Sequence, residues 1–562
     1  MAPLSTQRRR RRRAAATGAL AVVVAAFVLD ACAIPPVGTL PSLRSPLEAP
    51  PTIAGRAPVH GALRAPGGPF LYDSAGRVVI LHGVNAVYKH PPYELYPDPG
   101  KPWNFDASDA SLMARLGFDV VRLGMTWRGL EPGTAPSNDP AICSRGAPGD
   151  PGQFDQGVLD RYLGHLAQTV NLLGRYHIYT ILDMHQDVYN EAFDGEGAPN
   201  WAVCTNGLPN VDPPGRWSLN YGTAAAGAAF RHFWTNDVQG DLQGEFDRVW
   251  AAVAGYFRSN PWVLGYDPFN EPFSTSLVTV GDEHFDDQLT CFYTGRLYVT
   301  PPVKGGPSLP CPPQVPATGV VPTILGADPA HLVLYEPDVY GARGAPNFVG
   351  PMHFPRLVFN VHIYCGYRSP VTGNPTNLVA CAAQDARSLA TRAEDRLDLA
   401  SPAQPSGPAW LVSEFGATSD PTLLRDFANH LDHHLVGWVY WAWKFYADPT
   451  GSAAESLVMA DGRLRSTATE LSRAYPEAVA GRPTLISSDP ATGAFDLAYV
   501  ANHASPAPTV VFLPTALHYP GGYCARATGA RVVSAGGSRL LEVRNDPHAK
   551  DVTVSVVPGS CD

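Results

Sequence analysis

The sequence predicts an α/β fold, a (β/α)8 TIM barrel followed by a C-terminal all-β sandwich. From about residue 70, eight short apolar runs alternate with stretches of helical periodicity over roughly 400 residues, which is typical of a barrel with enlarged loops. After Gly481 the helical pattern stops, and short β-type runs separated by turn residues indicate a sandwich. The alternative is a doubly wound open sheet, but no glycine-rich phosphate fingerprint follows the first strand.

The individual elements follow from these runs. The barrel strands are expected at Val78–Val84, Val120–Met125, Ile178–Met184, Val263–Phe269, Leu332–Tyr335, Leu357–Tyr364, Ala409–Ser413 and Val436–Trp441. Helical segments lie between several of them, and two of these segments end at a glycine, Gly117 or Gly174. The sandwich strands are expected at Thr484–Ile486, Ala494–Val500, Thr509–Phe512, Arg531–Val533, Leu540–Val543 and Val552–Val557. We therefore expect a barrel domain over 61–480 and a sandwich domain over 481–562.

Residues 1–33 have the pattern of an export signal. A positive segment, Arg8 to Arg13, precedes an apolar run from Ala14 to Leu29 that is shorter than the ~20 residues a membrane span needs. The cleavage site has two interpretations: Leu29-Asp30-Ala31-Cys32 resembles a lipobox with a lipid on Cys32, and Ala31-Cys32-Ala33 fits ordinary secretion. A third interpretation of this segment is an uncleaved N-terminal anchor. We expect an extracellular or cell-surface protein, either secreted or lipid-anchored.

Residues 34–60 are rich in proline and lack an apolar period, so they are expected to form a semi-rigid linker.

The composition of the chain narrows the class of partner. Across all 562 residues, 45% are apolar and 16% charged, which indicates a globular protein. The net charge of −10 and the isoelectric point near 5.9 argue against a nucleic-acid partner, since the one arginine run lies in the export signal. A neutral small molecule or polymer is the expected substrate.

The cysteine count agrees with export. Of the nine cysteines, eight remain without Cys32, an even number that suits disulfides in an oxidising compartment. Neighbours along the chain suggest four pairs, although the sequence alone leaves the connectivity open: Cys143–Cys204, Cys291–Cys311, Cys365–Cys381 and Cys524–Cys561. None of the cysteines has the C-x-x-C spacing of a metal site, so structural disulfides are favoured over zinc.

Polar residues follow most of the expected barrel strands, where the active site of such a barrel forms. In chain order they are Asn85 and Lys89, Arg122, Asp183-Met184-His185-Gln186-Asp187, Asn270-Glu271-Pro272, His362-Ile363-Tyr364, Ser413-Glu414-Phe415-Gly416, and Trp441. Glu271 and Glu414 follow the fourth and seventh strands, so both should face one mouth. Hydrolysis of a glycosidic bond needs such a pair, one carboxyl to protonate the leaving oxygen and one to attack the anomeric carbon. A lone glutamate is usually a solvated surface residue, but this ordered set favours a catalytic pair.

The motifs resemble those of glycoside hydrolase family 5 over roughly residues 76 to 480. Asn270-Glu271-Pro272 is similar to the acid/base signature of the family, and Ser413-Glu414-Phe415-Gly416 to its nucleophile strand. The resemblance implies that six further positions support the reaction: Arg122, His185, Asn270, His362, Tyr364 and Trp441. For His185 we favour the role of a hydrogen-bonded structural residue over that of a general base.

Within that family, three stretches resemble the endoglycoceramidases, which release an intact glycan from ceramide. They are Asp183 to Tyr189, Gly197-Ala198-Pro199-Asn200-Trp201-Ala202 and Arg216-Trp217-Ser218-Leu219, and a fourth match lies at Arg473 to Gly481. The resemblance implies that Lys89, Asp187 and Trp217 hold the sugar next to ceramide. The chemistry suits this, because a carboxylate accepts from sugar hydroxyls, an ammonium donates to them and an indole covers a pyranose ring. The alternative roles are a surface lysine for Lys89, a loop cap for Asp187 and a core residue for Trp217.

The expected reaction is hydrolysis with retention, in which Glu414 attacks and Glu271 serves first as acid and then as base. Arg122 and Tyr364 are expected to hold Glu414 and keep it ionised, and Asn270 to bond the sugar 2-hydroxyl. No metal or organic cofactor is required. The expected partners are a glycolipid and, through a lipidated Cys32 or the substrate, a membrane surface; the sequence carries no signal for an oligomeric state.

Three other functions remain alternatives. A glucosylceramide or steryl-β-glucoside hydrolase would share every catalytic residue and differ in its loops. An endo-β-glucanase agrees less well with the lipid-glycoside-like motifs at Asp187 and Trp217. A non-catalytic carbohydrate-binding surface lipoprotein belongs to another class, and the intact pair of glutamates argues against it.

Overall fold

The structure is a computed structural model that describes residues 62–144, 154–211, 217–274, 283–298, 308–311, 318–345, 347, 349–369 and 372–561. Eight parallel strands close into a barrel in which strands that follow each other in the chain are neighbours. They are β3 (His82–Ala86), β4 (Val120–Met125), β5 (Tyr179–Met184), β6 (Val263–Asp267), β9 (Leu332–Tyr335), β10 (Leu357–Ile363), β11 (Ala409–Gly416) and β12 (Gly437–Trp441). The predicted TIM barrel is confirmed. The predicted export signal, residues 1–33, and the predicted linker, residues 34–60, lie outside the described residues.

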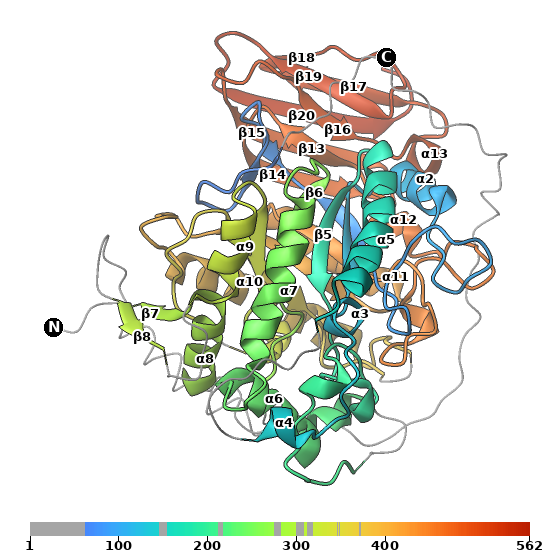
Figure 1. Cartoon of the computed structure of the whole chain (residues 1–562). Helices are drawn as coiled ribbons and strands as arrows, with labels where there is room; N and C mark the ends of the chain where they lie inside the picture. The colour runs from blue at the N-terminus through green and yellow to red at the C-terminus, as the bar shows by residue number, and fades with distance from the viewer. Residues whose placement is uncertain are drawn as a thin grey trace.

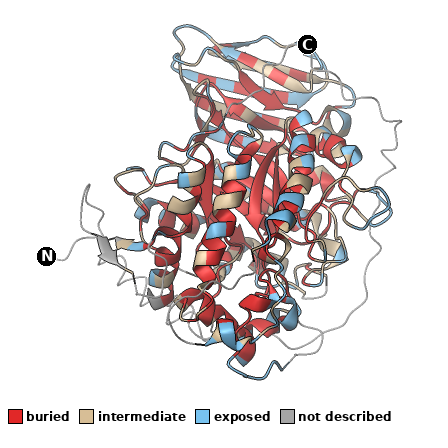
Figure 2. Ribbon diagram, in the orientation of Figure 1, coloured by how far each residue is buried: buried red, intermediate tan, exposed pale blue. Residues whose placement is uncertain are grey.

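Helices surround the barrel and present one buried face to it, while their outer faces are exposed (Figures 1 and 2). The longer ones are α2 (Ala107–Leu116), α5 (Gln156–Arg175), α6 (Ala224–Thr235), α7 (Leu242–Phe257), α8 (Glu283–Thr294), α9 (Val320–Ala327), α10 (Leu378–Asp398) and α11 (Pro421–His433). Among the described residues, no helix combines the length and the hydropathy needed to cross a bilayer.

Short elements occupy the loops between these helices and strands. They are α3 (Trp127–Leu130), α4 (Pro140–Cys143), η1 (Glu191–Phe193), η2 (Asn200–Ala202), η3 (Trp217–Gly222), β7 (Arg296–Tyr298), β8 (Ser308–Pro310), η4 (Val339–Arg343), η5 (Ala453–Glu455), α12 (Ala468–Leu471) and α13 (Thr515–His518). Several of them lie at the carboxyl ends of the barrel strands and so shape the barrel mouth.

Two antiparallel sheets form the predicted sandwich. One has the order β1-β2-β13-β16-β19-β18 and the other β14-β15-β20-β17. Their strands are β1 (Leu71–Tyr72), β2 (Val78–Val79), β13 (Tyr475–Val479), β14 (Gly481–Asp489), β15 (Ala494–Ala501), β16 (Thr509–Phe512), β17 (Tyr523–Thr528), β18 (Ala530–Val532), β19 (Leu540–Asn545) and β20 (Asp551–Pro558). Side chains of both sheets share one hydrophobic core, so the all-β sandwich is confirmed.

The expected first barrel strand, Val78–Val84, is two strands in the structure. Val78 and Val79 pair with β13 in the sandwich, and the barrel strand begins only at His82. The run is mainly apolar because one part is buried in the sandwich and the other in the barrel. The expected domain boundary after residue 480 falls between two sandwich strands, since β13 precedes it and β14 follows it.

The sandwich packs at the amino ends of the barrel strands. Gly117, which ends α2 with a φ of 86°, accepts a hydrogen bond from the Tyr475 hydroxyl at 2.7 Å. A Cβ at this position would approach the Phe512 ring to 2.3 Å, so both the backbone conformation and the close packing require glycine. Figure 1 shows the sandwich at one end of the barrel and α4 and α6 at the other.

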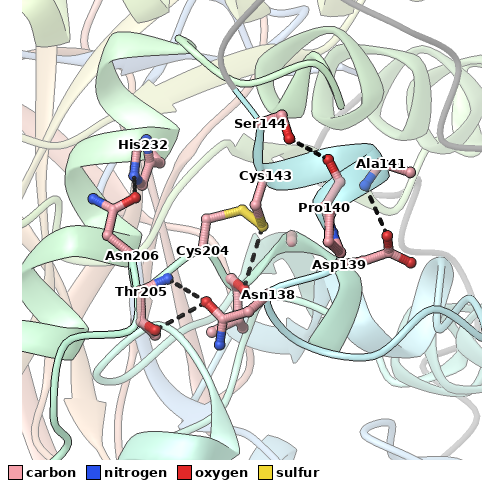
Figure 3. The surroundings of a disulfide bond; sticks show 12 residues. Asn138, Asp139, Pro140, Ala141, Cys143, Ser144, Cys204, Thr205, Asn206 and His232 are labelled. Atoms are coloured by element: carbon pink, nitrogen blue, oxygen red, sulfur yellow. Dashed lines mark hydrogen bonds between the residues drawn. A yellow bond between two sulfur atoms is a disulfide. The ribbon is translucent and has the colours of Figure 1, made fainter.

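All four suggested disulfides are present: Cys143–Cys204, Cys291–Cys311, Cys365–Cys381 and Cys524–Cys561. The first joins the end of α4 to the loop after η2 at the barrel mouth (Figure 3). Beside it, the Asn138 side chain accepts hydrogen bonds from the backbone and hydroxyl of Thr205 at 2.7 and 2.9 Å. These contacts fasten two loops that border the predicted site.

Candidate active site

Arg122, on β4, lies at the centre of the barrel mouth and is fully buried. Its guanidinium donates to acceptors from several surrounding elements, including the carboxylates of Asp183, Asp267, Glu336 and Glu414 and the Asn270 side chain. Burying so large a cation is costly unless acceptors of this kind surround it. The arrangement therefore fixes the strand ends relative to one another.

Glu414, on β11, receives two hydrogen bonds on separate oxygens. Arg122 donates to Oε1 at 2.5 Å, and the Tyr364 hydroxyl donates to Oε2 at 2.8 Å. This confirms the expected contacts. We expected Arg122 to hold the pKa of Glu414 low, but burial raises that pKa and outweighs the positive charges of His362 and Arg122. The two donors still favour the ionised form, and they orient both oxygens.

Glu271 follows β6 and lies across the mouth from Glu414. Its Oε1 is 2.8 Å from Nδ1 of His362, and one carboxylate oxygen of each glutamate lies within 4.8 Å of the other. Glu271 has a positive φ of 46°, which is uncommon for a residue with a side chain and is concentrated at functional sites. The side chain of Glu271 is 15% exposed, and that of Glu414 is 6% exposed.

Asn270, immediately before Glu271, is held on both ends of its amide. It accepts from Arg122 at 2.9 Å and donates to the backbone oxygen of Gln186 at 2.9 Å. The Gln186 side chain in turn donates to the Asn270 backbone oxygen at 2.8 Å. These reciprocal bonds connect the ends of β5 and β6 and fix the direction in which Glu271 leaves the strand.

Lys89 and Asp187 form an ion pair beside the glutamates. The Lys89 ammonium lies 2.6 Å from Asp187 and 3.2 Å from Asp448, and it donates to the Thr450 hydroxyl at 2.6 Å. Lys89 is only 3% exposed, so it is not a solvated surface lysine. Burial lowers its pKa, but the negative charges of Asp187, Asp448 and Glu196 raise it well above the usual range.

Trp441 connects this ion pair to the catalytic side of the mouth. The Lys89 ammonium lies 4.7 Å from the centre of its ring, and the His185 ring stacks on it at 5.4 Å. His185 also bonds to Asp183 at 2.7 Å, and although burial opposes this, the Asp183 charge raises the pKa of His185 to about 10. A protonated imidazole has no lone pair to accept a proton, which agrees with a structural role for His185.

Trp217 begins η3 and is half-buried. Its ring centre lies 6.4 Å from that of Tyr221, on whose hydroxyl the charges of Asp187 and Glu271 act. The role of Trp217 as a sugar platform stays a prediction. The remaining predicted residues all lie at the carboxyl ends of barrel strands or directly after them.

The sequence reasoning missed several residues of the site. Asp267, at the end of β6, accepts from Arg122 at 2.9 Å. Glu336 directly follows β9, so the rule that polar residues follow barrel strands could have found it. Glu196 lies beside Lys89 and forms a backbone bridge with Asp187, and burial raises its pKa well above the usual range despite the Lys89 charge. Asp448 and Thr450 come from the loop after β12, where no local pattern marks them.

Two groups of acidic residues and histidine have the spacing of cation ligands. One is His185, Asp187 and Glu196; the other is Glu271, His362 and Glu414. In the first, the Lys89 ammonium already lies against Asp187. In the second, the Arg122 guanidinium contacts Glu414 at 2.5 Å. The positive charge near each group thus comes from side chains of the protein itself.

Comparison with known proteins agrees with this geometry. The family model of cellulase (glycosyl hydrolase family 5) matches residues 100–447, and that of the glycoside hydrolase family 5 C-terminal domain matches residues 473–557. The second match begins just before β13, as the sheet topology requires.

Individual relatives cover nearly the whole chain. Endoglycoceramidase I of Rhodococcus hoagii is 28% identical, with 88% of each sequence covered. Two solved structures of endo-glycoceramidase II from Rhodococcus sp., a lactosyl-enzyme intermediate and a ganglioside GM3 complex, match with TM-scores of 0.66 and 0.67 at 26% and 25% identity. Each match covers 88% of this chain and 100% of the other. Because the cellulase model matches more than half of the sequence, the chain belongs to glycosyl hydrolase family 5.

Proposed function

We propose that this protein is a retaining β-glycosidase that hydrolyses the bond between the glycan and the ceramide of glycosphingolipids. The observation that carries the proposal is that a pair of facing glutamates and a buried Lys89–Asp187 ion pair share one barrel mouth. The glutamates supply the chemistry of glycosidic cleavage. The ion pair and Trp441 supply donors, acceptors and an aromatic face for the sugar beside the cleaved bond.

In the first half of the reaction, Glu414 attacks the anomeric carbon. The hydrogen bonds from Arg122 and Tyr364 hold its carboxylate in one orientation, so little reorganisation is needed when the new bond forms. Glu271 protonates the departing oxygen as the glycosidic bond breaks. Its greater exposure agrees with this role, because the leaving group must reach it from the open side of the cleft.

In the second half, water attacks the glycosyl-enzyme and Glu271 takes a proton from that water. The stereochemistry is expected to be retained. One carboxylate oxygen of each glutamate lies within 4.8 Å of the other, and this proximity supports a pair of the kind found in retaining enzymes, whose carboxyl carbons are ~5–5.5 Å apart. A relative trapped as a lactosyl-enzyme intermediate supports a covalent step.

Two observations support cleavage at the lipid rather than removal of single sugars from the far end. Relatives matched over most of their length are named endoglycoceramidases. In addition, two residues of the bulky stretch Trp443-Lys444-Phe445-Tyr446, which follows Trp441, contact α2. Trp443 is fully buried and donates to Asp109 of α2 at 2.8 Å, and the Lys444 ammonium lies 2.5 Å from the same carboxylate. These contacts direct both side chains to α2, which supports a cleft that stays open to outer sugars.

Products formed from lactosylceramide test the proposal. We expect intact lactose and ceramide, identified by mass spectrometry, because the Lys89–Asp187 pair grips the sugar at the cleaved bond. Release of galactose, or activity on glucosylceramide or a steryl glucoside alone, would favour the exo-acting alternative. Absence of release from any β-glycoside would favour the non-catalytic carbohydrate-binding lipoprotein.

We also propose that the protein acts outside the cell or at its surface, secreted or anchored through Cys32, where it meets glycolipid at a membrane. The four disulfides support an oxidising compartment. The mature protein is expected to contain no free thiol, measured by thiol titration of denatured, unreduced protein isolated from the medium or the membrane fraction. Two or more reactive thiols per chain, or recovery from the cytoplasm alone, would contradict this.

A further inference from the structure

Glu336 is a buried carboxylate that contacts both halves of the catalytic machinery. It follows β9 and is 2% exposed. Its Oε1 accepts from Arg122 at 3.0 Å and lies 3.2 Å from Nε2 of His362, and its Oε2 accepts from the backbone N–H of Glu271 at 3.0 Å. Its own backbone is fixed by the Tyr293 hydroxyl, which accepts from the Glu336 N–H at 3.1 Å and donates to its carbonyl at 2.9 Å.

The Arg122 guanidinium, the Glu271 N–H and, at 3.5 Å, the Asn360 side-chain amide donate to this carboxylate, so it is suited to remain ionised. Burial by itself raises its pKa, but the charges of His362 and Arg122 and the Glu271 N–H lower it below the usual value. An ionised carboxylate can only accept, so at 3.2 Å its charge favours a proton on Nε2 of His362. Nδ1 lies 2.8 Å from Oε1 of Glu271 and 3.4 Å from Oε2 of Glu414. At the shorter contact it shares a single proton with Glu271, whichever of the two atoms holds it.

We propose that Glu336 is a positioning residue for the acid/base step, which keeps His362 protonated on Nε2 so that one proton stays at the contact between His362 and Glu271. In the first half-reaction this proton leaves the pair for the departing glycosidic oxygen, as the bond from that oxygen to the anomeric carbon breaks and a Glu414 oxygen bonds to the carbon. In the second, the pair regains a proton from the attacking water, whose oxygen displaces Glu414. The inference rests on the proposed roles of the two glutamates.

Other charged and titratable groups surround the same pair. Those that face His362, Glu271 or Glu414 are Arg122 on β4, His185 after β5, Tyr221 on η3, Asp267 on β6, Arg343 on η4 and Tyr364 after β10. Among the described residues, Glu336 is the one whose side chain meets both the His362 ring and the Glu271 backbone. Removing its charge should therefore change the proton on this pair more than it changes the nucleophile.

The substitution Glu336→Gln tests the inference. The amide carries no negative charge, and its NH2 group faces either Arg122 and His362, in the place of Oε1, or the Glu271 N–H, in the place of Oε2. In both orientations the negative charge that holds the proton on Nε2 of His362 is gone, so the tautomer with a bare Nε2 and a proton on Nδ1 becomes more populated. That tautomer donates to Glu271, stabilises its ionised form and lowers the pH at which the acid is lost. We expect the alkaline limb of the kcat/KM profile to move down by about one pH unit or more, and kcat/KM near neutral pH to fall about tenfold or more for an alkyl β-lactoside.

Two comparisons isolate the acid step. A 2,4-dinitrophenyl β-lactoside hardly needs protonation of its leaving group, so Glu336→Gln should reduce its kcat/KM far less. Glu336→Asp retains the charge and should keep the alkaline limb near its wild-type position, even where the shorter side chain lowers the rate. An unmoved limb, or an equal loss on both substrates, would overturn the inference. A wild-type protein that cleaves neither lactoside would instead contradict the proposed function itself.

Discussion

Replacing Glu414 by glutamine should lower kcat by about 10⁴-fold or more, because the amide cannot form the glycosyl-enzyme. The change preserves the size of the side chain, and its carbonyl oxygen can still accept from Arg122 or Tyr364. Glycolipid binding should therefore remain, since the groups at Lys89 and Asp187 are untouched. Turnover of a fluorogenic β-lactoside and calorimetric binding of lactosylceramide in detergent micelles measure the two quantities separately.

The variant Glu414→Gly identifies the nucleophile by its product. The cavity left by the side chain admits azide, which should attack the face that Glu414 occupied and give the inverted glycosyl azide. Glu271→Gly is the matched control, because azide there should intercept the glycosyl-enzyme and give the retained product. If the two products are exchanged between the variants, the roles of the glutamates are exchanged as well.

The barrel could be predicted from the sequence because each strand is a short apolar run buried on both faces. β4 and β9 match their expected limits. β13 was not predicted, because Pro476 and Glu477 interrupt its apolar pattern. β17 was not predicted either, because its residues are only partly buried at the edge of a sheet. No local pattern in the sequence shows where β2 ends and β3 begins, because consecutive residues there are buried in two different cores.

The catalytic pair could be predicted because topology alone brings the carboxyl ends of parallel strands together. Asp448 and Thr450 could not, because their contact with Lys89 depends on the path of the loop after β12. The pKa of Glu414 illustrates a further limit of such reasoning. The sequence indicated the arginine that lowers this pKa, but the burial that outweighs it is a property of the folded mouth.

Replacing Glu271 by alanine should reduce kcat/KM in proportion to how much the leaving group needs a proton. For lactosylceramide, whose leaving group is an alkoxide, the loss is expected to be about 10²–10⁴-fold, the usual contribution of a general acid. For a 2,4-dinitrophenyl β-lactoside the first step should proceed at nearly the wild-type rate, because the phenolate departs without help. Steady-state kinetics on both substrates measures this difference.

The same substitution should also slow the second step, since no base remains to activate water. With the dinitrophenyl lactoside, the Glu271→Ala variant should then accumulate glycosyl-enzyme, seen as a burst of one equivalent of dinitrophenolate and as a mass increase of one lactosyl group on Glu414. Azide should restore turnover, because this anion attacks the intermediate without base assistance. A uniform loss on both substrates, with no burst and no response to azide, would show that Glu271 supports the structure of the mouth rather than the transfer of the proton.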